Sequence, residues 1–316
     1  MAHYRCIGDV PQKRHTHHLD EAGHRFAEEL MGQEGFSSDS SLLYHHQSPS
    51  ALTEITEVHV DLGERGAAPD RPITPRHVRT GEVATGEDTV VGRRVLLRND
   101  DVEVSWVRAT SDSELYRNAI GDELVYVQSG SARLESVFGR LDVGTGDYVV
   151  VPASATHRWV VVSGPVELLV MASSGHVTVP AKYLTERGQF LEGAPYCERD
   201  LRAPNELIIE SGTDVPVLVR NRGGWSRHVH RHHPFDVVGW DGCLYPYALN
   251  IDDFEPIVGS IHQPPPVHQT FALPGAVVCS FVPRLFDFHP NAVKVPYHHA
   301  NTDSNEVLFY SADDFM

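Results

Sequence analysis

The stretch VPYHHANTDSNEVLFY, residues 295–310, contains side chains that commonly bind metal ions. Two adjacent histidines, His298 and His299, stand a short polar loop ahead of Glu306, which opens an apolar run. Two histidines and one carboxylate suit Fe(II), because they hold the ion on one face and leave the opposite positions open for substrate and oxygen. His299 and Glu306 would supply two of these three ligands, so the pattern suggests half of a metal site. The alternative is a solvated turn that leads into a strand, since His and Glu are common in loops.

Composition limits the class of protein that can carry such a site. The chain has 316 residues, 41% of them hydrophobic, and a formal net charge of −17 at pH 7. It is long enough for one large or two ordinary domains. The negative charge disfavours nucleic acid and anionic membranes as partners, because both are bound through an excess of Lys and Arg. The N-terminus lacks the apolar core of a signal peptide, and no apolar run is long enough to span a bilayer. We therefore expect a cytoplasmic globular protein.

The apolar residues predict an all-β fold. Short Val-rich runs such as DYVVVPA, HRWVVVS and VPVLVRNR repeat with a period of two, and Gly, Pro, Ser and Asp separate them. This alternation is typical of strands, and the separating residues are typical of turns. Only DEAGHRFAEELMG has a helical pattern, which Gly23 weakens.

The most specific fold pattern lies in the first half of the chain. The stretch GTGDYVVVPASATH predicts a tight turn, a buried strand, a proline-led turn, and His157 at the start of the next strand. It resembles the second motif of the cupin β-barrels, and Glu123 with Gly130 resembles the end of the first motif. Residues 117–119, Arg-Asn-Ala, stand where the first motif has its histidines. We therefore expect this barrel to be structural and free of metal.

Other histidines form clusters that offer alternative ligands. Along HVHRHH (His228, His230, His232 and His233), alternate residues of a strand share one face, so two of them could chelate a metal. The N-terminal RHTHH (His15, His17 and His18) is a weaker candidate. A polar strand edge explains the first cluster equally well.

Longer matches extend the resemblance over nearly the whole chain. The stretches HHPFDVVGWDGCLYPYALNIDDFEP, GSIHQPPPVHQTF and VPYHHANTDSNEVLFY, in this order, are similar to the homogentisate 1,2-dioxygenase family, particularly its bacterial branch. This resemblance implies a bicupin subunit, a non-haem Fe(II), and the opening of the homogentisate ring by O2 to give maleylacetoacetate in tyrosine and phenylalanine breakdown. It also implies trimer-based homo-oligomers. We expect a metal-free N-terminal domain with a wrapping segment over residues 1–200, and a C-terminal domain with the active site over residues 201–316.

The resemblance assigns roles to individual residues. His299 and Glu306 match iron ligands of the family, and Asn301 matches an asparagine near substrate and oxygen. His262 matches the active-site histidine that bonds to a substrate hydroxyl and acts in acid/base catalysis, a task for a group with a near-neutral pKa. His268 stands close by and is the alternative for this role.

Two departures from the family pattern leave rival functions open. Phe315 stands where many members have a substrate-binding tyrosine, and the lost hydroxyl favours another hydroxylated aromatic acid as substrate. The last ligand histidine of the family belongs to a second motif that residues 201–316 do not contain, so we expect an incomplete second barrel. A non-catalytic cupin is the rival reading of this second departure.

Overall fold

Two long antiparallel strands form the centre of the protein. The structure, a computed structural model, describes residues 3–63, 75–261, 267–294 and 298–311. Strands β8 (Glu123–Ser136) and β11 (His157–Ser173) pair along most of their length. Gly130 lies where the pairing shifts register, with φ of 80°, and a Cβ atom there would come within 2.6 Å of the Pro165 carbonyl oxygen. Only glycine adopts this conformation without strain, which accounts for Gly130 in the sequence.

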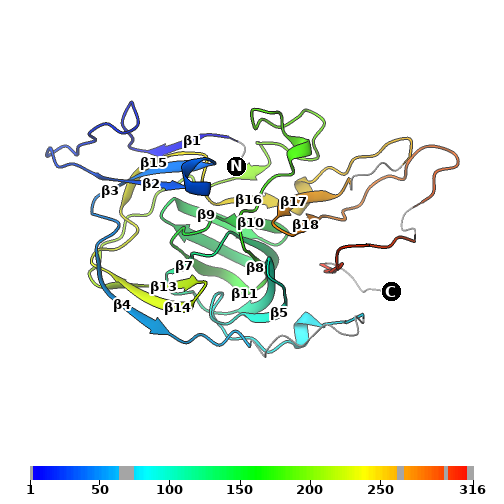
Figure 1. The fold of residues 1–316 in the computed structure, drawn as a ribbon, viewed down its shortest axis with the longest axis horizontal. Helices are drawn as coiled ribbons and strands as arrows, with labels where there is room; N and C mark the ends of the chain where they lie inside the picture. Colours follow the sequence, from blue (N-terminus) through cyan, green and yellow to red (C-terminus); the bar gives the residue numbers. More distant parts are fainter. Residues whose placement is uncertain (1–2, 64–74, 262–266, 295–297, 312–316) are drawn as a thin grey trace.

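Ten further strands complete a 12-stranded sheet around this pair (Figure 1). One path through the sheet runs β12 (Leu201–Arg202), β16 (Tyr247–Asn250), β10 (Asp147–Val151), β8, β11, β7 (Tyr116–Asn118), β13 (Val215–Asn221), β14 (Gly224–His230) and β4 (Leu52–Val58). Strands β6 (Val102–Ala109), β5 (Arg94–Arg98) and β9 (Gly139–Gly144) join beside it. Strands from before and after residue 200 thus share one sheet. The expected division into an N-terminal domain, residues 1–200, and a C-terminal domain, residues 201–316, stays a prediction.

A smaller sheet carries the N-terminal strands. Its order is β1 (Arg5–Gly8), β15 (Val237–Gly242), β3 (Ser40–His45) and β2 (Ala27–Gly32). The helical expectation for DEAGHRFAEELMG is wrong, because its second half is β2, paired with β3 from Ala27 to Gly32. The described residues contain no α-helix, and therefore none that could span a membrane. Their helical turns are four three-residue 3-10 segments: η1 (Glu34–Phe36), η2 (Thr80–Glu82), η3 (Ala181–Tyr183) and η4 (Ile251–Asp253). The all-β prediction is confirmed.

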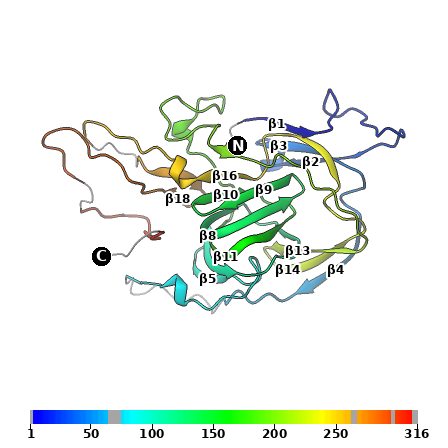
Figure 2. The same cartoon turned by 180° about the vertical axis from the view of Figure 1, so that it is seen from behind.

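The chain after η4 forms little regular structure. Strands β17 (Gln269–Leu273) and β18 (Ala276–Cys279) make a two-stranded sheet. From Ser280 onward the described residues form no strand, and the ribbon extends away from the large sheet before it returns (Figures 1 and 2). After η4 the described residues therefore contain one hairpin, β17–β18, and no closed barrel.

The first-half motif forms the predicted elements. The turn before β10 is closed by a hydrogen bond from the Gly144 amide to the Asp147 carboxylate, 2.8 Å long. All five residues of β10 are buried. After Pro152 the Ala155 amide donates back to the Pro152 carbonyl, and His157 then begins β11 with its side chain buried. This stretch is predicted correctly because each turn is fixed by a local side chain or by proline.

A buried carboxylate lies next to His157. Glu123, 1% exposed, accepts three hydrogen bonds at Oε1, from Arg93 Nη1 (3.0 Å), the Tyr116 hydroxyl (2.8 Å) and Asn118 Nδ2 (3.2 Å). Arg93 is also buried, and its Nε donates to the Thr89 carbonyl. A charge in such a position needs an opposite charge and hydrogen bonds. Arg93, adjacent to β5, provides the positive charge.

The ion pair keeps Glu123 charged, and burial keeps His157 neutral. Burial alone would raise the pKa of Glu123, but the charge and hydrogen bond of Arg93 outweigh burial and lower it to about 2. Burial lowers the pKa of His157, so this imidazole is neutral at pH 7. Since the pKa of Glu123 is lower than its ordinary value of 4.5, its stabilising contribution is present above pH 4.5 and is lost as the pH falls toward 2.

Removal of the guanidinium is expected to destabilise the fold strongly. We expect Arg93→Met to lower the free energy of unfolding by about 3–5 kcal/mol, because it leaves the Glu123 carboxylate buried without its counter-charge. The exposed Arg98 provides the matched control, and Arg98→Met should change stability by less than about 0.5 kcal/mol. Urea denaturation at pH 7 measures both. Equal stability of the two variants would contradict a structural role for the pair.

Candidate functional site

Two of the predicted metal ligands lie together. His299 Nε2 and Glu306 Oε2 are 3.6 Å apart, in chain without regular secondary structure. Two donors bound at a right angle to one ion, each about 2 Å from it, stand roughly 3 Å apart. The observed separation therefore suits adjacent positions on a single divalent ion. Both side chains are about half exposed, at 56% and 47%, so solvent and small molecules can reach them.

The other predicted site residues are Asn301, His262 and Phe315. Asn301 is exposed in the same loop. His262 and Phe315 lie outside the described residues. Among the described residues, no group of three or more His, Cys, Asp and Glu side chains is placed to hold a metal ion. The described part of the chain thus supplies two converging donors, and the third ligand that the resemblance implies is not among them.

His268, the alternative to His262, is part of the packing around β17 and β18. Its side chain is 6% exposed, and its ring lies against Phe281 with centroids 4.7 Å apart. Its carbonyl accepts from the Ser280 amide at 2.8 Å. These contacts connect the start of β17 to the end of β18, so they favour a structural role for His268.

Residues 306–311, here called the Glu306 segment, contact the large sheet at Phe309. The Phe309 ring lies 5.9 Å from Trp106 on β6 and 6.0 Å from Tyr126 on β8. Two residues later the Ser311 carbonyl accepts from Gln128 Nε2 at 2.6 Å. These contacts could not be predicted from the sequence, because an apolar residue after Glu306 gives no sign of which strand it will meet.

Glu306 also lies near β18. Burial raises the pKa of the Cys279 thiol, and the negative charge of Glu306 raises it further. The ring of Phe271 on β17 packs against Tyr148 on β10 at 5.5 Å, and the hydroxyls of Tyr148 and Ser280 are 3.1 Å apart. The candidate metal pair is therefore in a region where β17 and β18 meet the large sheet.

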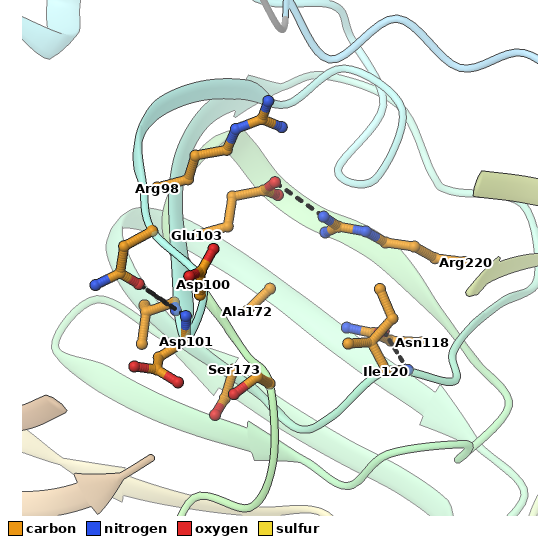
Figure 3. Close-up of a pocket in the computed structure, with 12 residues that line it drawn as sticks. Arg98, Asp100, Asp101, Glu103, Asn118, Ile120, Ala172, Ser173 and Arg220 are labelled. Carbon is orange, nitrogen blue, oxygen red and sulfur yellow. Dashed lines mark hydrogen bonds and ion pairs between the residues drawn. The ribbon is translucent and has the colours of Figure 1, made fainter. Parts of the chain in front are cut away.

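A cleft of about 490 Å³ opens elsewhere, where β5 and β6 meet and β7, β11 and β13 end (Figure 3). Glu103 and Arg220 face each other across it in an ion pair of 2.9 Å. Three carboxylates, including Asp100 and Asp101, line it against the guanidiniums of Arg98 and Arg220. Its lining does not include the predicted ligands, and its excess of negative charge suits an aromatic carboxylate poorly.

Two of the HVHRHH histidines, His228 and His233, contact other polar groups. His228 and His230 lie on β14, where the Nε2 atom of His228 is 3.1 Å from the Ser226 hydroxyl. Burial, together with the nearby Arg117 charge, lowers the pKa of His230 to about 4. His233 contacts Glu210 at 3.2 Å and accepts from the Phe235 amide. In the N-terminal cluster, His15 pairs with Glu28. For His15, His228 and His233 the structure therefore shows ion pairs and side-chain hydrogen bonds.

Comparison with known proteins places the chain in a family. Residues 91–251 match the family described as homogentisate 1,2-dioxygenase N-terminal. A Saccharolobus solfataricus protein, provisionally named a dioxygenase, is 37% identical over 318 residues, which cover all of this chain and 82% of that protein. Homogentisate 1,2-dioxygenase of Rhodopseudomonas palustris is 26% identical over 78% of this chain and 56% of its own length. The Caenorhabditis elegans enzyme of the same name is 28% identical over 58% of this chain and 43% of its own.

A solved structure is also similar over part of the chain. A cupin-2 domain protein from Shewanella frigidimarina covers 26% of this chain and 78% of its own, with 16% identity and a TM-score of 0.24. The chain spans about half the length of the two homogentisate 1,2-dioxygenases above. The family match extends over just over half of the chain and leads to one conclusion: the chain belongs to the homogentisate 1,2-dioxygenase family.

Proposed function

We propose that this protein is an Fe(II)-dependent dioxygenase that opens the ring of homogentisate with O2 to give maleylacetoacetate. The observation that carries the proposal is the convergence of His299 and Glu306, the two residues that match the family's ligand motif. Homogentisate 1,2-dioxygenase is the name of several relatives, and family membership supports the same class of reaction here.

The donor set of the pair fits iron in part. An imidazole nitrogen and a carboxylate oxygen suit Fe(II), and their separation fits two adjacent coordination positions. When bound, Fe(II) would supply a site at which the phenolic substrate and O2 are held next to each other and exchange electrons. His299 and Glu306 would hold the ion, while their half-exposed positions leave room for the substrate.

Other residues would orient the substrate and move its proton. Asn301, in the same exposed loop, carries an amide that would hydrogen-bond to the substrate or to oxygen. His262 would accept the proton of a substrate hydroxyl, as a neutral imidazole does near pH 7. Both atoms of O2 enter the product, so the reaction requires no further reductant. We also propose, from the family resemblance, a cytoplasmic location and a trimer-based homo-oligomer.

Metal binding tests the assignment of the ligands. We expect the protein to bind Fe(II) weakly, and His299→Ala to reduce the affinity at least tenfold, because one of two converging donors is lost. His298→Ala is the matched control, since this exposed histidine is the immediate neighbour, and it should leave the affinity within twofold. Anaerobic equilibrium dialysis measures both. A larger loss in the control would move the ligand assignment to His298.

Oxygen uptake tests the substrate. We expect O2 consumption with homogentisate, one molecule per ring opened, and little with gentisate, because the site would recognise the longer acidic side chain. An oxygen electrode gives the rates and mass spectrometry the product. A preference for gentisate or another hydroxylated acid would support the alternative that Phe315 raises. Absence of uptake with every acid would favour a non-catalytic cupin.

The role of His262 has a separate test. We expect His262→Gln to retain Fe(II) binding but to lower turnover by roughly a hundredfold, the usual effect of losing a positioned acid/base group. His268→Gln should instead lower the melting temperature, because His268 is buried against Phe281. If His268→Gln lowers turnover of a stable protein while His262→Gln does not, the two roles are reversed.

A further inference from the structure

A single row of residues crosses five strands of the large sheet. Trp106 on β6 pairs with Leu169 on β11, Leu169 with Tyr126 on β8, and Tyr126 with Tyr148 on β10. Tyr148 in turn pairs with Leu249 on β16. Residues directly opposite each other in paired strands point to the same face of a sheet. These five residues, the aromatic row, therefore form one band on one face.

Two segments from the end of the chain lie on the aromatic row. Phe271 of β17 packs on Tyr148 at 5.5 Å, with the rings nearly perpendicular. Phe309 lies on both Trp106 and Tyr126, whose paired partner Leu169 stands between them in register. Edge-to-face and tilted ring pairs at these distances stabilise contacts beyond the burial of their area.

Phe309 differs from its neighbours in burial. It packs against the main core cluster, whereas Val307, Leu308 and Tyr310 are 50–59% exposed. The hydrogen bond from Gln128 Nε2 to the Ser311 carbonyl secures the same stretch two residues later. Gln128 is on β8, two residues after Tyr126. One strand of the sheet therefore contacts the segment at two points.

Glu306 is only three residues before Phe309. Three extended residues span at most about 11 Å, so the contact at Phe309 limits how far the Glu306 carboxylate can move from the sheet. The carboxylate itself lies on the exposed part of the segment, 3.6 Å from His299. An exposed ion pair of this kind contributes little to its own placement.

We infer that Phe309 is a positioning residue: it packs residues 306–311 against the aromatic row and thereby places the Glu306 carboxylate for metal binding. The inference rests on the proposed function in naming a metal as the ligand of Glu306. The large sheet would in this way determine the geometry of a site formed by a distant part of the chain. Phe309 touches neither metal nor substrate in this role.

Hydrogen exchange and Co(II) binding on the full chain test the inference. We expect Phe309→Ala to increase amide exchange of residues 306–311 at least tenfold without metal, and to weaken Co(II) binding about tenfold. Phe309→Leu should retain most of the slow exchange and most of the Co(II) affinity, because an apolar side chain still packs on Trp106 and Tyr126. Leu308→Ala, at an exposed neighbouring position, is the matched control and should change each by less than twofold.

Gln128→Ala provides a variant on the sheet side. It removes one hydrogen bond to Ser311 at a half-buried side chain, so it should increase exchange and weaken Co(II) binding by a smaller factor than Phe309→Ala, with little change in the melting temperature. A merely structural residue would lower the melting temperature and leave the Co(II) affinity of the folded protein unchanged.

The outcomes separate the inference from the proposed function. Faster exchange in Phe309→Ala with unaltered Co(II) affinity would overturn the inference. In that case the contact of Phe309 with the aromatic row would order residues 306–311 without placing the Glu306 carboxylate. Unaltered exchange would overturn it as well. If the wild type binds no Co(II), the proposed function fails, and with it the positioning role of Phe309 at a metal. Amide exchange of residues 306–311 would then show only whether Phe309 holds this segment on the sheet.

Discussion

A carboxylate buried in the large sheet must have a cation beside it, and this requirement shapes the first half of the protein. Glu123 is fully enclosed, and Arg93 meets it from the segment before β5. The desolvation of both charges is severe, so the pair is stable only because Tyr116 and Asn118 add hydrogen bonds at the same oxygen. The interaction connects β7, β8 and the chain leading into β5 at one point, next to His157, whose pKa is lowered by burial.

The Glu123–Arg93 pair stabilises the large sheet, whereas the candidate metal ligands lie outside this sheet. With the Arg93 guanidinium beside it, the charge of Glu123 is compensated within the sheet, and neutral His157 donates to the Ala155 carbonyl through Nδ1. The large sheet is then a rigid platform, with the aromatic row on one face. The converging imidazole and carboxylate, His299 and Glu306, belong instead to a segment without strands. Rigidity and ligand donors come from different parts of the sequence.

Sequence reasoning succeeded where structure is determined by near neighbours. The turn at Gly144, buried strand β10 and the return at Pro152 follow from residues within a dozen positions, and all were predicted. It failed for β2, because DEAGHRFAEELMG has helix-forming residues, yet pairing with β3 outweighs local propensity. Arg93 was also missed: it is 30 residues before Glu123, and spacing cannot show that a particular arginine will be folded inside.

The candidate site shows the same limit more sharply. The types and order of His299 and Glu306 could be read from the sequence, and the structure brings them within 3.6 Å. Their surroundings could not be read, because these depend on the register of β6, β8 and β11, which aligns Trp106, Leu169 and Tyr126. A shift of one residue in any of these strands would turn its member of the row to the opposite face. The placement of a half-exposed carboxylate thus depends on strand pairing far away in the sequence.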